Sequence, residues 1–312
     1  MSEIILHQYD RSPFARKLRA AFGIKGVTWR SADVPSMPPR PALSLLAGGY
    51  RRIPVLQLGA DIFCDSNLAL RVLETLVASP PLTLPGDTLS IPVSQWFEPR
   101  LFSAFSVLRF RKREDLKGVF ESPEEGAAFG RDRAAFMAPM MDISKNAENA
   151  PTALAHAASF AAWIEDVLGH AGDFLLGAAP SFADLSAWHP FFWFKGSSAQ
   201  RELLADYPRL WAWVDRIEAF GEGQRSAIDP DQTLAIARAA EPCYRFADAR
   251  PSPIDPALGT RVSVAPTDYG VDPVVGELVS IGRDHVSVRR ATSETGDVVV
   301  HFPRWGYRVL PA

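Results

Sequence analysis

The 312-residue chain has 33 basic and 36 acidic side chains, a formal net charge of −3, and 47% hydrophobic residues. This length suits two or three packed domains, and the near-neutral charge offers no basic field for nucleic acid or an anionic membrane. No apolar run approaches the roughly 18 residues of a membrane-spanning helix, and residues 1–12 lack a signal-peptide pattern. We therefore expect a cytoplasmic protein whose partner is a small molecule.

The first 79 residues predict one α/β domain. A short strand, a helix and a second strand come first, followed by a proline-rich loop, a β-hairpin and another helix. This order is typical of a thioredoxin-like sheet with parallel and antiparallel parts. The strands are expected at 3–9, 27–30, 53–58 and 62–64, the helices at 13–22 and 66–77, and the loop at 35–41.

A cluster of prolines near residue 80 predicts a linker, and a second domain over 90–240 shows helical periodicity. Its helices are expected at 92–113, 123–137, 151–168, 182–188, 208–219 and 233–240. Three prolines between residues 250 and 256 mark another linker. Beyond it the pattern changes to short strands at 261–264, 276–281, 285–290, 298–302 and 307–310, which predict a small β-barrel-like domain over 257–312.

Neither the cysteines nor the histidines form a recognisable metal pattern. Cys64 and Cys243 are far apart and make no CxxC motif, and no two of the six histidines have the i, i+4 spacing that places both on one helical face. We therefore predict no disulfide framework and no metal site, and we expect both cysteines to be buried, reduced thiols.

Three short motifs are candidates for a binding site. Ser12 precedes Pro13 at the start of the first predicted helix, where the positive end of the helix dipole favours an anion. Ile53-Pro54 opens a strand, and a cis peptide there would expose the Ile53 backbone to a ligand. Asp65-Ser66 follows a strand and could hold charged groups. Helix capping and turn formation explain each motif equally well when it is considered alone.

Taken together, the motifs resemble the glutathione transferase family, especially its serine-type classes, over residues 4–220. Pro180-Ser181-Phe182-Ala183-Asp184 also resembles that family's buried capping motif in the helical domain. The resemblance implies glutathione as co-substrate, with Ser12 as the catalytic residue on its sulfur.

The resemblance also implies roles for the other site residues. The backbone of Ile53 before Pro54 would pair with the cysteinyl unit, and Asp65 with Ser66 would hold the γ-glutamyl end. Arg52 would approach the glycine carboxylate, and Arg40, in a loop that departs from the family pattern, would help to hold the same carboxylate.

The chemistry required of Ser12 is modest. Lowering the pKa of a thiol from about 8.5 by roughly two pKa units requires about 2.7 kcal/mol of thiolate stabilisation. A hydroxyl bonded to a charged sulfur contributes about 1.5 to 3 kcal/mol, and a helix start about 0.3 to 1 kcal/mol. The thiolate would then attack a hydrophobic electrophile or a peroxide. Phe102, Phe105 and Arg109 fall on one helical stripe and are candidates for the electrophile pocket, although core packing would produce the same stripe.

Several alternatives remain open at this point. Tyr9 is a rival catalytic hydroxyl, because other classes place a tyrosine at the end of the first strand. The chain is alternatively a non-catalytic interaction or regulatory module, or a glutathione-dependent thiol oxidoreductase that uses Cys64. The resemblance further implies a homodimer and a role in detoxification.

The β-rich end lies outside the two-domain family pattern. Its charged and aromatic side chains form either a binding surface or a solvated face. They are Arg289, Arg290, His301, Arg304 and Trp305.

Overall fold

The computed structural model describes residues 3–110, 122–196 and 201–312. The chain divides into two compact units. Unit 1 comprises residues 1–18, 26–73 and 224–312, and unit 2 comprises residues 19–25 and 74–223. The C-terminal β-rich segment therefore shares a unit with the N-terminal strands.

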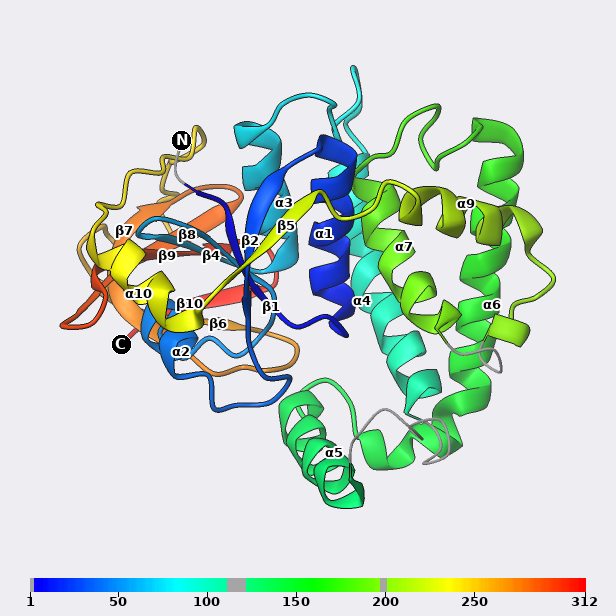
Figure 1. The fold of residues 1–312 in the computed structure, drawn as a ribbon, viewed down its shortest axis with the longest axis horizontal. Coiled ribbons are helices and arrows are strands. Elements are labelled where there is room, and N and C mark those ends of the chain that lie inside the picture. The colour runs from blue at the N-terminus through cyan, green and yellow to red at the C-terminus, as the bar shows by residue number, and fades with distance from the viewer. Residues whose placement is uncertain (1–2, 111–121, 197–200) are drawn as a thin grey trace. The chain divides into compact units, whose positions relative to one another are not determined.

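A ten-stranded sheet forms the framework of unit 1, with the strand order β10-β6-β7-β8-β9-β4-β3-β1-β2-β5 (Figure 1). Pairing is parallel for β1–β2, β2–β5 and β4–β9 and antiparallel elsewhere. The strands are β1 (Ile5–Gln8), β2 (Thr28–Asp33), β3 (Val55–Leu58), β4 (Asp61–Cys64), β5 (Gln224–Ile228), β6 (Arg261–Pro266), β7 (Val274–Ile281), β8 (His285–Thr292), β9 (Gly296–Pro303) and β10 (Tyr307–Pro311).

The predicted thioredoxin-like part of the fold is confirmed. Helices α1 (Pro13–Lys25) and α3 (Ser66–Leu76) follow β1 and β4. Gly59 turns the β3–β4 hairpin with a φ of 60°, a left-handed conformation that glycine adopts without steric cost. A short helix, α2 (Pro41–Ala47), begins where the proline-rich loop was expected to end.

The predicted C-terminal β-rich extension is present, and it continues the N-terminal sheet. Asp61, Ile62 and Phe63 of β4 pair in parallel with Val299, Val300 and His301 of β9. The extension thereby covers an edge of the sheet that would otherwise be unpaired. At the opposite edge, β5 pairs with β2.

A large core cluster of unit 1 lies on one face of this continuous sheet. Alternate residues of β8 and β9 (Val286, Val288, Val298, Val300 and Phe302) are buried in this cluster together with Ile62 and Cys64 of β4. Helices α2 and α10 (Pro230–Arg238) contribute side chains to the same cluster. The opposite face of β8 and β9 therefore carries Ser287, Arg289 and His301.

In the described part of unit 2, the regular structure is helical apart from an isolated bridge between Phe174 and Gly177. Its elements are α4 (Ser90–Arg109), α5 (Pro123–Met137), the 3₁₀ helix η2 (Ile143–Lys145), α6 (Asn146–Ala171), α7 (Phe182–Lys195) and α9 (Pro208–Glu218). Each except η2 overlaps a predicted helix, but α6 and α7 are longer than predicted: α6 was expected over 151–168, and α7 over 182–188. Residues 111–113 of the helix expected over 92–113 lie outside the described residues.

The predicted capping motif at the start of α7 is confirmed. Ser181 caps the helix, and the Asp184 carboxylate accepts hydrogen bonds from the backbone N–H groups of Ser181 and Leu175, both at 2.9 Å. Trp213 Nε1 donates to Asp184 over 2.9 Å as well. This buried carboxylate therefore organises the core of unit 2, as the sequence motif implied.

Candidate functional site

The strand register brings the three predicted motifs to one end of the sheet in unit 1. Val55 pairs with Cys64 across the β3–β4 hairpin and with His7 across β1–β3. Continuing both registers places Pro54 beside Asp65 and places Ile53 near the turn that follows β1. The turn containing Ser12, the Ile53-Pro54 step and the Asp65-Ser66 step therefore share one rim.

Ser12 lies at the start of α1, where it is buried and hydrogen bonded through its side chain and its backbone. Its Oγ accepts a hydrogen bond from Ala15 N over 3.2 Å, its N–H donates to Tyr9 O, and its carbonyl accepts from Arg16 N. Its exposure is 2%. The capping bond uses an oxygen lone pair, which leaves the hydroxyl proton available to a ligand.

Asp65, and not Ser66, caps α3. Asp65 has a φ of 79°, and its Oδ1 accepts from Asn67 N over 2.8 Å. Lys17 is fully buried, and its ammonium donates to Asn67 Oδ1 over 2.6 Å and to Ser66 Oγ over 3.4 Å. Buried positive charge thus accompanies the Asp65 carboxylate at the rim, where Ile53-Pro54 is a cis peptide.

The C-terminal extension contacts two of the predicted glutathione-binding residues. Arg52 donates to the carboxylate of Asp268 and to the carbonyl of Tyr269, and its guanidinium lies 3.9 Å from the centre of the Tyr269 ring. Tyr307 donates to Asp65 Oδ2 over 3.2 Å. Sequence reasoning did not find these partners, because their proximity depends on where the extension joins the sheet.

Arg40, the second arginine predicted near a glycine carboxylate, makes its hydrogen bonds to backbone carbonyls close to it in the sequence. Its guanidinium donates to the carbonyls of Pro35, Ser36 and Arg51 at 2.7 to 2.8 Å. With an exposure of 6%, it holds the loop before α2 together.

Two tyrosines form a directed chain to Asp65. The hydroxyls of Tyr50 and Tyr307 lie 2.7 Å apart, and Tyr307 donates its single hydroxyl proton to the Asp65 carboxylate. Tyr50 must therefore donate to Tyr307. Burial raises the pKa of both hydroxyls well above their usual range, so both stay protonated.

The direction of this chain predicts unequal effects of two matched substitutions. Tyr307→Phe leaves the Tyr50 hydroxyl without an acceptor and is expected to lower the free energy of unfolding by about 1 to 3 kcal/mol. Tyr50→Phe removes a donor but leaves Tyr307 bonded to Asp65, so its cost should be smaller. Urea denaturation of both variants measures the difference, and an equal or reversed order would contradict the assigned direction.

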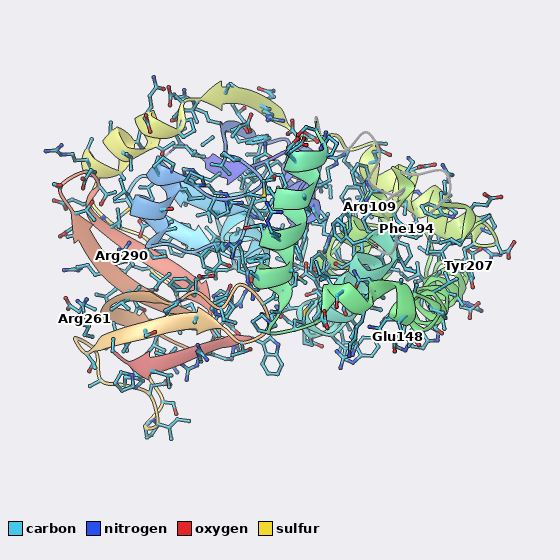
Figure 2. All side chains as sticks on the ribbon, turned by 90° about the horizontal axis from the view of Figure 1, so that it is seen from below. Arg109, Glu148, Phe194, Tyr207, Arg261 and Arg290 are labelled. Atoms are coloured by element: carbon cyan, nitrogen blue, oxygen red, sulfur yellow. The ribbon has the colours of Figure 1, made fainter. Side chains whose placement is uncertain are left out.

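The candidate electrophile-pocket residues all lie on α4 in unit 2. Phe105 is fully buried, and its ring packs edge-on against Phe191 and Phe194 at 4.8 Å, which is the environment of a core residue. Phe102 stacks on Trp193, and the Arg109 guanidinium lies 5.8 Å from the same ring. Figure 2 labels Arg109 and Phe194 within this helical unit. The pocket role of these α4 residues stays a prediction.

Cys64 is fully buried, and burial raises the pKa of its thiol well above the usual range. A thiol held protonated in this way is a poor nucleophile. Cys243, which was expected to be buried, is exposed. Among the residues that the structure describes, no group of three or more His, Cys, Asp or Glu side chains is arranged to hold a metal ion. Within the same residues, no helix has both the length and the apolar character needed to cross a membrane.

Comparisons with known proteins agree with this architecture. Residues 6–81 match the model of the glutathione S-transferase N-terminal domain, and residues 130–216 match that of the C-terminal domain. A search of curated proteins found no match. A GST-like protein from Pseudomonas syringae is 35% identical, with a TM-score of 0.79 and complete coverage of both chains.

More distant structures share the fold. The β-etherase LigF from Sphingobium sp. is 16% identical with a TM-score of 0.51, over 70% of this chain and 96% of its own. A glutathione S-transferase from Rhodospirillum rubrum is also 16% identical, with a TM-score of 0.50, over 69% and 88% of the two chains. The full-length match to the Pseudomonas protein includes the C-terminal extension. The chain therefore belongs to the glutathione S-transferase family.

Proposed function

We propose that the protein is a glutathione transferase in which Ser12 stabilises the thiolate of glutathione for attack on a small hydrophobic electrophile or a peroxide. The observation that carries this proposal is the placement of Ser12 at the start of α1, on the same rim as Ile53-Pro54 and Asp65-Ser66. The Ser12 hydroxyl donates to sulfur, and the helix start adds partial positive charge. Asp65 takes the ammonium of the γ-glutamyl end.

The stabilised thiolate supplies the nucleophile, so no covalent enzyme intermediate is required. A serine at this position cannot form a mixed disulfide, which favours conjugation or peroxide reduction over thiol exchange. Burial of Cys64 also argues against a thiol oxidoreductase. A cytoplasmic location, a homodimer and a role in detoxification stay predictions that rest on the family resemblance.

A second candidate, a non-catalytic interaction module, is favoured by one observation. The extension already engages both Arg52 and Asp65, through Asp268, Tyr269 and Tyr307. With these contacts made, Arg52 is not free to hold a glycine carboxylate. Glutathione would then depend on the remaining groups of the rim for its affinity.

Calorimetric titration of the wild-type protein with glutathione, together with a chloronitrobenzene conjugation assay, distinguishes the two candidates. We expect saturable binding and turnover, with binding weakened about tenfold or more in Asp65→Ala because a charged hydrogen bond is lost. Glu277→Ala, at an exposed position on β7, is the control and should bind as wild type. If the folded wild-type protein neither binds glutathione nor shows turnover, the transferase proposal is wrong and the interaction module is the remaining candidate.

A further inference from the structure

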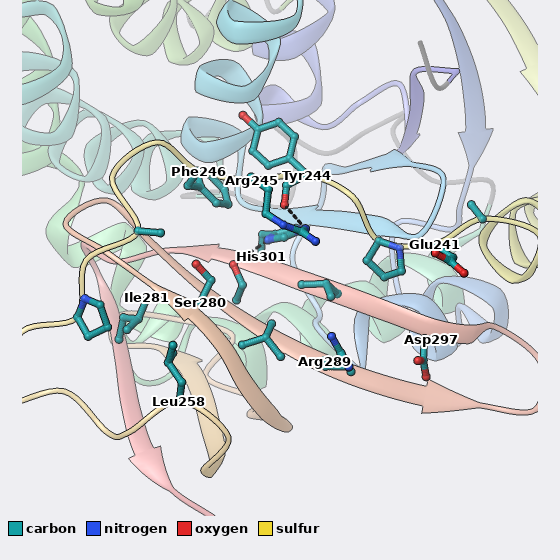
Figure 3. Close-up of a pocket in the computed structure, with 17 residues that line it drawn as sticks. Glu241, Tyr244, Arg245, Phe246, Leu258, Ser280, Ile281, Arg289, Asp297 and His301 are labelled. Atoms are coloured by element: carbon teal, nitrogen blue, oxygen red, sulfur yellow. Dashed lines mark hydrogen bonds between the residues drawn. The ribbon is translucent and has the colours of Figure 1, made fainter.

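A cavity of about 510 Å³ lies in unit 1 on the face of β7, β8 and β9 opposite the core, beneath the segment 240–258. None of the residues assigned to glutathione lines it. Figure 3 shows Arg245, Ser280, Arg289 and His301 in its middle. Because side chains alternate along a strand, the polar residues of β8 and β9 face this space while their neighbours fill the core.

The floor of the cavity contains a hydrogen-bonded chain from a serine to a carboxylate. Ser287 Oγ lies 2.8 Å from His301 Nδ1, and His301 Nε2 lies 2.9 Å from Asp61 Oδ1. Asp61 also accepts from the N–H groups of Cys243 and Tyr244, which anchors the covering segment. The His301 ring stacks on Phe63 at 4.5 Å.

The carboxylate fixes the proton positions in this chain. Burial would raise the pKa of Asp61, but its hydrogen bonds to His301 and to the two backbone N–H groups lower it, so the group is an acceptor. Burial lowers the pKa of His301, whose neutral ring therefore donates from Nε2 to Asp61. Nδ1 must then accept, and the Ser287 hydroxyl donates to it. The Ser287 oxygen is left as an acceptor toward the cavity.

A second serine, histidine and carboxylate lie nearby. Ser280 Oγ lies 2.8 Å from His285 Nε2, and His285 Nδ1 lies 3.2 Å from Asp248 Oδ1. Phe246 from the covering segment stacks on His285 at 3.9 Å. Ser280 and His285 share a hydrogen bond, and the Asp248 carboxylate lies beside the other ring nitrogen of His285. Ser280 and Ser287 both line the cavity, and the Ser287 oxygen is the one whose proton is committed to a histidine.

Charged and apolar side chains define the rest of the space. Across the described residues, no hydrogen bond or ion pair engages the Arg289 guanidinium, and Figure 3 places Arg289 and Arg245 on either side of His301. Glu241 and Asp297 lie at one end of the cavity, while Leu258 and Ile281 lie at the other. The acidic end would repel a second negative charge on a ligand, and the other end accepts apolar surface.

We propose that this cavity is a second ligand site, which binds a small hydroxylated monocarboxylate with an apolar or aromatic body. The ligand hydroxyl donates to Ser287, and its carboxylate pairs with Arg289, two residues along the same strand face and so about 7 Å away. Val299, paired with Arg289 across β8–β9, lines the cavity and supplies apolar surface beside the carboxylate end.

The test uses three matched probes in calorimetric titrations without glutathione. We expect para-hydroxyphenylacetate to bind saturably at millimolar concentration or below. Phenylacetate, which lacks the hydroxyl, and para-hydroxyphenylacetamide, which lacks the charge, should each bind more weakly. Ser12→Ala should bind all three as wild type does, so this result is independent of the glutathione site.

Two substitutions separate the roles of the polar groups. Arg289→Gln should weaken binding of both acids about tenfold, whereas Arg308→Gln, at an exposed arginine on β10, should leave binding unchanged. Ser287→Ala should weaken binding of the hydroxylated acid severalfold but not that of phenylacetate. If Ser287→Ala folds poorly, Leu258→Trp is the alternative, because Leu258 is 54% exposed and a larger side chain would fill the apolar end.

Leu258→Trp is expected to abolish binding of every probe. Absence of saturable binding to the wild-type protein at millimolar concentration would overturn the proposal. Equal losses of probe affinity in Arg289→Gln and Arg308→Gln would also overturn the proposal. Unchanged probe binding in Leu258→Trp would overturn it as well.

Discussion

Ser12→Ala is expected to reduce glutathione-dependent conjugation by about 10- to 150-fold, which is the rate equivalent of losing a hydrogen bond of about 1.5 to 3 kcal/mol to a charged sulfur. The loss should be largest near neutral pH, where the wild-type protein but not the variant holds bound glutathione as thiolate. Following thiolate absorbance as pH is varied, with glutathione bound, measures the shift directly. An unchanged thiolate pKa would exclude Ser12 from this role.

The same substitution also removes a helix cap, so a matched control is needed. Ser122 caps α5 through Glu125 N at 3.1 Å and is followed by a proline at the first helical position, as Ser12 is. Ser122→Ala should lower stability by a similar amount, about 1 kcal/mol, without reducing turnover. Tyr9→Phe should retain turnover as well. Activity lost in Tyr9→Phe and kept in Ser12→Ala would assign the reaction to the rival hydroxyl.

Local patterns in the sequence predicted most elements of both units. The start of α1 at Pro13, the α5 helix at 123–137 and the cap at Ser181 follow from short-range signals, and they appear where expected. Strand β5 was missed because four of its five residues are exposed and carry no alternating pattern. Its strand character comes from pairing with β2, almost 200 residues away in the sequence, which no local signal can show.

The candidate site was predictable in the same partial way. Ser12, Ile53, Asp65 and Ser66 could be predicted as site residues because each belongs to a motif of two or three adjacent residues. The partners of Arg52 and Asp65 were not found, because Asp268 and Tyr307 reach the rim only when β9 adds to β4. The same long-range pairing brings His301 beside Asp61 and creates the second cavity.

Acidification is expected to destabilise unit 1 well before its carboxylates titrate. His7 and His285 are both fully buried, and burial lowers the pKa of each from an ordinary 6.5 to about 4. In the unfolded chain both take up a proton below about pH 6.5, whereas the folded state does so only near pH 4. Their contribution to stability is therefore full above the unfolded pKa and is lost as the pH falls from 6.5 toward 4.

At pH 5 the two histidines together should lower the free energy of unfolding by about 4 kcal/mol relative to pH 7, since one pKa unit corresponds to about 1.4 kcal/mol per group. Burial lowers the pKa of His301 as well and acts in the same direction. Urea denaturation at a series of pH values and constant ionic strength measures the slope of the free energy of unfolding against pH. His7→Gln should flatten it by up to about 1.4 kcal/mol per pH unit between pH 5 and 6. His156→Gln, at an exposed position, should leave it unchanged. An equal slope in wild type and His7→Gln would mean that β1 accommodates a charged imidazole, and would remove His7 as a cause of acid sensitivity.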